Sequence, residues 1–151
     1  MTSKSKSAFW KKSPGKLGIF APLLGSWKAE ADSPMGKMKC TRTFTKFGTQ
    51  YVQLLAKWQH AKFTYDELAI YGVEDGTICF WSFTSDGKRS EGKFADGTDV
   101  HPQAIAFEAQ MPAGLARMVY WPDDAGGFYW VVESKTKKGW NRFTMDHYSA
   151  G

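Results

Sequence analysis

The chain has 151 residues, of which 42% are apolar and 16% aromatic, and its formal net charge at pH 7 is +5. This length suits one ordinary domain with a hydrophobic core, and the composition excludes a disordered chain. The six lysines of residues 1–28, a segment without acids, supply the positive charge, so residues 29–151 carry a net charge of −1. We therefore expect no basic face of the kind that binds nucleic acid specifically, and no apolar run approaches the ~20 residues of a membrane-spanning helix.

The first residues are rich in lysine and serine, and we expect residues 1–13 to form a flexible basic leader. A single domain is expected over residues 14–151. It begins with a predicted short helix that has Ser13 as its N-cap and Pro14 at its first position, and Pro22 limits the length of that helix.

The apolar run of residues 17–24 imitates a signal peptide behind its lysines. Pro22 interrupts this run, and residues 26–28 are bulky and charged, which is unsuitable just before a signal-peptide cleavage site. We therefore do not expect a signal peptide. The two cysteines, Cys40 and Cys79, form no CxxC or Cys/His cluster, which predicts free thiols, with one disulfide as the alternative. We expect a cytoplasmic protein without a metal site.

Turn-forming sequences such as Asp-Gly recur after residue 25, and the stretches between them are rich in Val, Ile, Thr and aromatic residues. This pattern predicts an all-β fold. A closed sheet leaves no exposed edge, and a barrel of this size has room for a cavity. We therefore expect an up-and-down antiparallel barrel of about ten strands, closed at one end by the short N-terminal helix. The predicted strands cover residues 25–32, 37–47, 51–60, 63–73, 77–85, 88–95, 104–111, 115–122, 128–136 and 139–148.

Arg42 lies in the middle of the apolar face of the second predicted strand. A buried guanidinium needs partners, because desolvation costs several kcal/mol. An internal salt bridge to Glu108 or Glu133, or an extended side chain that reaches the barrel mouth, would supply them. The alternative is an anchor for an anionic ligand, since the planar fork of arginine matches a carboxylate.

Other residues are expected to line the interior beside Arg42. The third strand places Leu54, Trp58 and His60 on one apolar face. His60 is interpreted as a hydrogen-bonded histidine of the rim or core, with metal or haem ligation and acid/base chemistry as alternatives. In the fifth strand both faces are apolar, so the alternation of apolar and polar side chains does not identify the face that points inward. The ligand-binding residues expected from the sequence are Arg42, Leu54, Trp58, His60, Tyr71 and Trp81.

The order of a short helix, Gly25-x-Trp27 and an antiparallel meander resembles the calycin group, which includes lipocalins, fatty-acid-binding proteins and nitrobindin-like proteins. The segments APLLGSWKAEA and GWNRFTMDHY resemble parts of bacterial lipocalin-like domains of unknown function. The resemblance covers about residues 15–148. It implies that Trp27 plugs the barrel end beside the helix, and that a basic residue of the last strand, here Arg142, packs over its indole.

No G-x-S-x-G elbow, phosphate loop or HExxH motif occurs in the sequence. An enzyme would have to use scattered barrel-lining groups such as His60, Tyr71 and Arg42. The sequence therefore favours a protein without catalytic activity. The leading prediction is a barrel that binds a small hydrophobic or amphipathic molecule, which can carry an anionic group.

Two alternatives belong to other classes of function. One is a haem-binding, nitrobindin-like barrel with His147 as the ligand, although the Lys-Ala-Glu-Ala sequence of residues 28–31 lacks the glycines of that pattern. Apart from haem, no cofactor is expected. The other is a structural or interaction barrel with a filled cavity and a homodimer interface of outer aromatic residues. Outward orientation of Trp81 and Trp130 would favour this second alternative.

Overall fold

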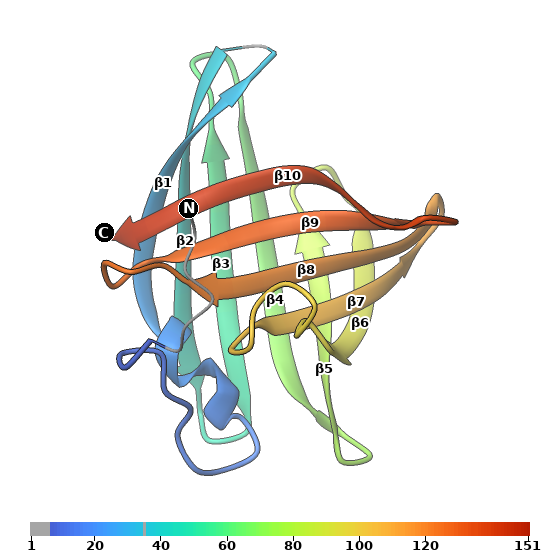
Figure 1. Cartoon of the computed structure of the whole chain (residues 1–151). Helices are drawn as coiled ribbons and strands as arrows, with labels where there is room; N and C mark the ends of the chain where they lie inside the picture. Colours follow the sequence, from blue (N-terminus) through green and yellow to red (C-terminus); the bar gives the residue numbers. More distant parts are fainter. Residues whose placement is uncertain (1–6, 35) are drawn as a thin grey trace.

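The chain forms ten strands and one short helix in a closed barrel (Figure 1). The computed structural model describes residues 7–34 and 36–151. The strands pair antiparallel in the order β1-β10-β9-β8-β7-β6-β5-β4-β3-β2, and the pairing of β1 with β2 closes the ring. The predicted all-β antiparallel barrel is confirmed. Its elements are η1 (Gly18–Leu23), β1 (Gly25–Ser33), β2 (Gly36–Phe47), β3 (Tyr51–Gln59), β4 (Thr64–Glu74), β5 (Thr77–Thr84), β6 (Arg89–Ala95), β7 (Ile105–Met111), β8 (Gly114–Pro122), β9 (Phe128–Thr136) and β10 (Gly139–Ala150).

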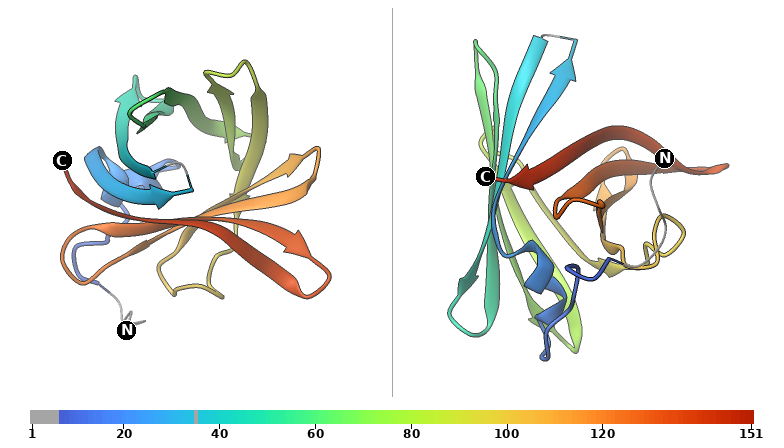
Figure 2. Two further views of the ribbon diagram at one scale, coloured as in Figure 1. Left: turned by 90° about the horizontal axis from the view of Figure 1, so that it is seen from above. Right: turned by 60° about the vertical axis from the view of Figure 1, so that its left-hand side comes forward.

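The helix η1 covers one end of the barrel, beside the turn between β2 and β3 (Figure 1). Strands β8, β9 and β10 run across the direction of β1, β2 and β3 (Figures 1 and 2). Phe20 of η1 is fully buried, with ring centroids 4.8 Å from Tyr71 of β4 and 5.8 Å from Phe107 of β7. The helix therefore closes its end of the barrel by inserting an aromatic ring into the core.

The helix is a 3-10 helix and is shorter than predicted. It begins at Gly18 and not at Pro14, because Gly15 has a φ of 103°, which a helix does not contain. Ser13 is not its cap; instead the backbone N–H of Ser13 donates to the carbonyl of Gly18 at 3.0 Å. Within the described ranges, no helix has the length and apolar character needed to cross a membrane.

Gly25 and Trp27 lie at the start of β1, directly after the helix. Gly25 has a φ of 123°, a conformation that favours glycine. The indole Nε1 of Trp27 donates to the carbonyl of Leu23 at 2.7 Å, and its ring meets Phe128 edge-on at 4.9 Å. Trp27 thus fastens the end of η1 to the barrel core.

The expected packing of Arg142 over Trp27 is wrong. The guanidinium of Arg142 lies 5.3 Å from the ring centroid of Trp121, and its Nε lies 3.5 Å from Glu133. A bulge between Arg142 and Thr144 shifts the pairing of β10 with β9. Because the inserted residue reverses the alternation, Arg142 faces outward, while Thr144 pairs with Val132.

The N-terminal segment contacts the barrel closer to the N-terminus than expected. Trp10 is buried, its ring lies 6.1 Å from Phe128, and its Nε1 donates to the carbonyl of Gln103 at 2.8 Å. The backbone N–H of Ser7 donates to the side chain of the same glutamine at 2.6 Å. The expected leader of residues 1–13 therefore contacts the barrel at Ser7 and Trp10, and residues 1–6 lie outside the described residues.

A second, smaller apolar cluster lies on the outside of the barrel wall. The loop between β6 and β7, residues 96–104, contributes Val100 and Ala104 to it. Beneath this loop the outward face of β7, β8 and β9 is buried, so part of the barrel exterior is a core in its own right. The buried members of the cluster are Ala106, Val119, Trp121 and Val131.

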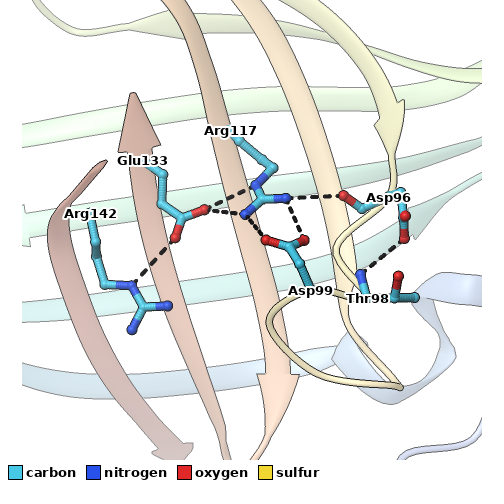
Figure 3. Close-up of polar contacts among 6 residues, drawn as sticks. All are labelled: Asp96, Thr98, Asp99, Arg117, Glu133 and Arg142. Atoms are coloured by element: carbon cyan, nitrogen blue, oxygen red, sulfur yellow. Dashed lines mark hydrogen bonds and ion pairs between the residues drawn. The ribbon is translucent and has the colours of Figure 1, made fainter. Parts of the chain in front are cut away.

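Charged groups hold the same loop against the wall (Figure 3). Arg117 of β8 donates from Nη1 and Nη2 to the two carboxylate oxygens of Asp99, at 2.8 and 2.9 Å. Its Nε and Nη2 also donate to Oε1 of Glu133, at 2.9 and 2.6 Å. Arg117 and Glu133 are both buried, so this arginine uses its planar fork for a structural purpose.

Candidate ligand site inside the barrel

Arg42 is the charged residue at the centre of the candidate site. It lies on the inward face of β2, between Cys40 and Phe44, and is 2% exposed. Its Nη2 donates to the hydroxyl oxygen of Tyr120 at 2.7 Å. Burial by itself would lower the pKa of Arg42, but Tyr120, Tyr148 and other neighbours outweigh it and hold the pKa above its ordinary value. The guanidinium is therefore a permanent positive charge in the interior.

Aromatic rings from four strands surround this guanidinium. Its central carbon lies 4.4 Å from the ring centroid of Trp130, 5.5 Å from Tyr120, 5.8 Å from Trp58 and 6.0 Å from Tyr148. A cation near an aromatic face is stabilised by roughly 0.5–2 kcal/mol. These rings lower the cost of burying the charge, but they accept no conventional hydrogen bond from its N–H groups.

Several polar atoms in this aromatic cage have no hydrogen-bond partner in the described structure. They are Nε and Nη1 of Arg42, Nε1 of Trp130 and the hydroxyl of Tyr148. A buried donor without an acceptor costs about 1–3 kcal/mol. Arg42 and Trp130 thus carry buried donors without an acceptor, and a bound molecule that supplies acceptors would satisfy them.

The salt bridges expected for Arg42 are wrong. Glu133 is on the outward face of β9 and is bound to Arg117 and Arg142. Glu108 pairs in register with Arg117, so it also faces outward. Within residues 7–34 and 36–151, the ion pairs do not include Arg42. Its position in the barrel centre also excludes the expected extension to the mouth.

Two carboxyl groups face the interior near Arg42. Asp146 of β10 pairs in register with Trp130 and is buried. Glu67 of β4 pairs with Ala56, the residue that also pairs with Arg42, and accepts a hydrogen bond from Ser82 at 2.6 Å. Burial raises the pKa of Asp146, and the charge of Arg42 opposes that rise.

Solvent reaches inward-facing side chains in the middle of several strands. Register places Met118 and Val132 on the same inward face as the buried Phe107, and both are only half-buried. Trp58, Tyr65 and Glu67 are also half-buried on the inward face of β3 and β4. These residues keep accessible surface although they face inward, and Trp58 among them belongs to the aromatic cage.

The structure brings together some of the predicted ligand-binding residues. Arg42 and Trp58 belong to the cage, and Tyr71 is buried beside it, where burial and the charge of Glu67 contribute to raising its pKa. Leu54 is fully buried in the core. His60 lies outside the cage, in the turn after β3, where its Nδ1 accepts from the backbone N–H of Lys62 at 3.1 Å.

The expected inward orientation of Trp81 is wrong. Its neighbours Phe80 and Ser82 are buried in the interior, so Trp81 faces outward from β5. Trp130, by contrast, is buried inside. The two tryptophans therefore lie on opposite sides of the wall, and the outward orientation that would favour an interaction barrel holds for Trp81 alone.

His147 also faces outward, and this corrects its placement as a haem ligand of the interior. Its side chain is 54% exposed, whereas its neighbours Asp146 and Tyr148 are buried. The ring stacks on Tyr129 at 4.4 Å, and Nε2 lies 2.6 Å from a carboxylate oxygen of Asp123. In the part of the chain that the structure describes, no three His, Cys, Asp or Glu residues are grouped as metal ligands.

The contact between His147 and Asp123 predicts a pH-dependent contribution to stability. Burial alone would raise the pKa of Asp123, but hydrogen bonds from His147 and from the backbone N–H groups of Ala125 and Gly127 lower it below 3.8. Since the folded-state pKa is the lower one, the stabilisation is complete above the unfolded-state value and is lost as the pH falls through the folded-state pKa.

We expect Asp123→Asn to reduce stability by about 1–2 kcal/mol at neutral pH, and the difference from the wild type to shrink as the pH falls below the ordinary carboxyl pKa of 3.8. Urea unfolding at several pH values measures this difference. Asp124→Asn, at an exposed neighbouring position, is the control and should change little at any pH. A difference for Asp123→Asn that does not shrink as the pH is lowered through the acid range would contradict the assignment.

Four groups of the site were not predicted from the sequence as ligand-binding residues: Tyr120, Trp130, Asp146 and Tyr148. Each is a polar or amphipathic residue on an inward face, so alternation along β8, β9 and β10 is the signal that could have found them. In β10 the bulge between Arg142 and Thr144 reverses the alternation of inward and outward residues. Their proximity to Arg42 depends on how the closed barrel brings β8, β9 and β10 opposite β2.

The two cysteines are free, as expected. Burial and the charge of Asp146 raise the pKa of the Cys40 thiol to about 11, so it is neutral beside Arg42.

No model of a known protein family matches the chain, and no curated protein matches it either. The closed ten-stranded barrel is consistent with the calycin-like architecture expected from the sequence.

Proposed function

We propose that the protein is a calycin-like barrel that binds a small, mostly apolar molecule with an anionic group, without catalysing a reaction. The observation that carries the proposal is the set of buried, unsatisfied polar atoms on Arg42, Trp130 and Tyr148. Ligand pockets combine an apolar lining with a few polar groups that orient the ligand. The aromatic cage and the half-buried inward side chains have this composition.

The apolar part of the ligand would lie along the half-buried inward side chains. Met118 and Val132 are apolar, and Trp58 offers both a ring face and contact with the cage. The anionic group would meet Arg42, the one cation that the described strands place next to these rings. Binding would then satisfy donors that the free protein buries at a cost.

A cavity-filling substitution tests this proposal. Val132→Phe places a larger side chain on the inward face, and we expect it to weaken the binding of both decanoic acid and decan-1-ol by about tenfold or more, because the ring takes space that the alkyl chain would occupy; tenfold corresponds to about 1.4 kcal/mol. Quenching of tryptophan fluorescence follows binding, and native mass spectrometry of freshly purified protein detects one retained small molecule per chain.

Met145→Phe is the matched control, since Met145 is exposed on the outward face of the adjacent strand. It should bind both probes as the wild type does. The proposal fails if the wild type shows neither saturable binding of the probes nor a retained molecule. It also fails if Val132→Phe binds both probes with unchanged affinity.

A further inference from the structure

We propose that the ligand is a carboxylic acid, and that its carboxylate binds at Arg42 together with one proton shared with Asp146. This inference rests on the proposed function, because it names the chemical class of the bound molecule and its protonation. It adds a role for Asp146, a residue that the sequence did not indicate. It also predicts that binding takes up a proton from solvent.

The unsatisfied atoms of the cage favour a head group that only accepts hydrogen bonds. The N–H groups of Arg42 and Trp130 can only donate, and the hydroxyl of Tyr148 can donate as well. A carboxylate offers about four lone-pair sites on two oxygens, which matches this set of donors. An alcohol or an amide would bring a donor of its own and would satisfy the set less completely.

The charges that face Arg42 limit how the carboxylate can enter. Asp146 faces it from β10 and Glu67 from β4; the other titratable groups near it, which are neutral at pH 7, are Cys40, Tyr71, Tyr120 and Tyr148. With both carboxyl groups ionised, their charge already exceeds that of Arg42. A third carboxylate would repel them strongly in an interior of low dielectric constant.

One proton removes this conflict, and Asp146 is placed to share it. Asp146 is opposite Trp130 in the register and two residues before Tyr148, so its carboxyl group is on the same inward face as two of the unsatisfied groups. Two carboxyl groups that share a site retain a proton to higher pH than either alone. Glu67 already accepts the hydroxyl hydrogen of Ser82. The proton comes from solvent, and no covalent bond forms.

The test is the pH dependence of binding, measured by calorimetry with decanoate and decan-1-ol between pH 5.5 and 8.5. For the wild type we expect the affinity for decanoate to fall by up to about tenfold per pH unit once Asp146 of the free protein is ionised, and the affinity for decan-1-ol to stay constant. Measurements in phosphate and in Tris, whose ionisation heats differ, count the protons taken up with decanoate.

Asp146→Asn keeps the shape of the side chain and removes its charge. This variant should bind decanoate with an affinity that no longer depends on pH, and at pH 8.5 it should bind more tightly than the wild type. Asp124→Asn, exposed in the turn between β8 and β9, should behave as the wild type does. Near-ultraviolet circular dichroism confirms that both variants are folded.

The outcomes separate this inference from the proposed function. If neither probe binds to the wild type, the proposed function itself is wrong. Decanoate binding without proton uptake or pH dependence in the wild type would overturn only the inference. So would an unchanged pH dependence in Asp146→Asn, because the proton would then belong to the ligand alone.

Discussion

Replacing Arg117 by methionine is expected to lower the free energy of unfolding by about 3–5 kcal/mol, since it leaves a buried carboxylate without its main partner. Arg117 is 2% exposed and donates to Glu133 at 2.6 Å. Glu133 is buried as well, and in the variant its nearest cation would be Arg142, at 3.5 Å. The same substitution releases Asp99 and so loosens the loop of residues 96–104 from the barrel wall (Figure 3).

Urea unfolding at neutral pH measures this loss, and Arg142→Met is the matched control. Arg142 contacts the same carboxylate, but its side chain is 41% exposed. Exposed ion pairs contribute about 0–1 kcal/mol, so the control should lose no more than that. Similar losses in the two variants would show that burial of Arg117 does not determine its effect.

The strand boundaries could be predicted because the residues that end the strands have distinctive backbone requirements. Asp75 and Gly76 connect β4 to β5, and both have positive φ, at 52° and 78°. This is the geometry of the tight hairpin turns that Asp-Gly sequences favour. Regular spacing of such turns in one chain leaves few alternatives to an antiparallel meander, so ten strands were predicted with small errors at their ends.

The inward and outward faces were harder to predict, because alternation has to be unbroken and the two faces have to differ. In β5 both faces are apolar, and Trp81 was assigned to the wrong one. In β10 the bulge after Arg142 reverses the alternation. In β8 and β9 the outward residues Val119 and Val131 are buried beneath a loop, so hydrophobicity does not distinguish their faces.

Of the candidate site, the sequence indicated Arg42, Trp58 and Tyr71, and Arg42 was notable as a charged residue on an apolar face. The four members that the sequence did not indicate come from strands more than seventy residues after Arg42, as with Tyr120. They meet Arg42 only because the register pairs Asp146 with Trp130 and Trp130 with Tyr120 across the closed sheet. Register across several strands is a cooperative property of the whole barrel, and local patterns do not determine it.

The two buried arginines of this barrel differ in how completely their hydrogen bonds are satisfied. Arg117 donates from all three of its side-chain nitrogens to protein oxygens. Arg42 has one such bond, to Tyr120, and its Nε and Nη1 have no partner within the described residues. Removing a charge that is fully paired leaves its partner buried and unpaired, whereas removing a charge with few partners relieves its own desolvation.

Arg42→Met is therefore expected to leave the stability of the unliganded protein within about 1 kcal/mol of the wild type, because the lost contacts are offset by relief of a desolvated charge. The same variant should bind decanoate about 30-fold or more weakly, since a buried charge pair contributes at least about 2 kcal/mol to binding, and should bind decan-1-ol normally. Fluorescence titration and urea unfolding measure both quantities. Arg89→Met, at an exposed position of β6, should change neither. If Arg42→Met destabilises the protein as much as Arg117→Met and leaves decanoate binding intact, Arg42 has a structural function and the anionic site is refuted.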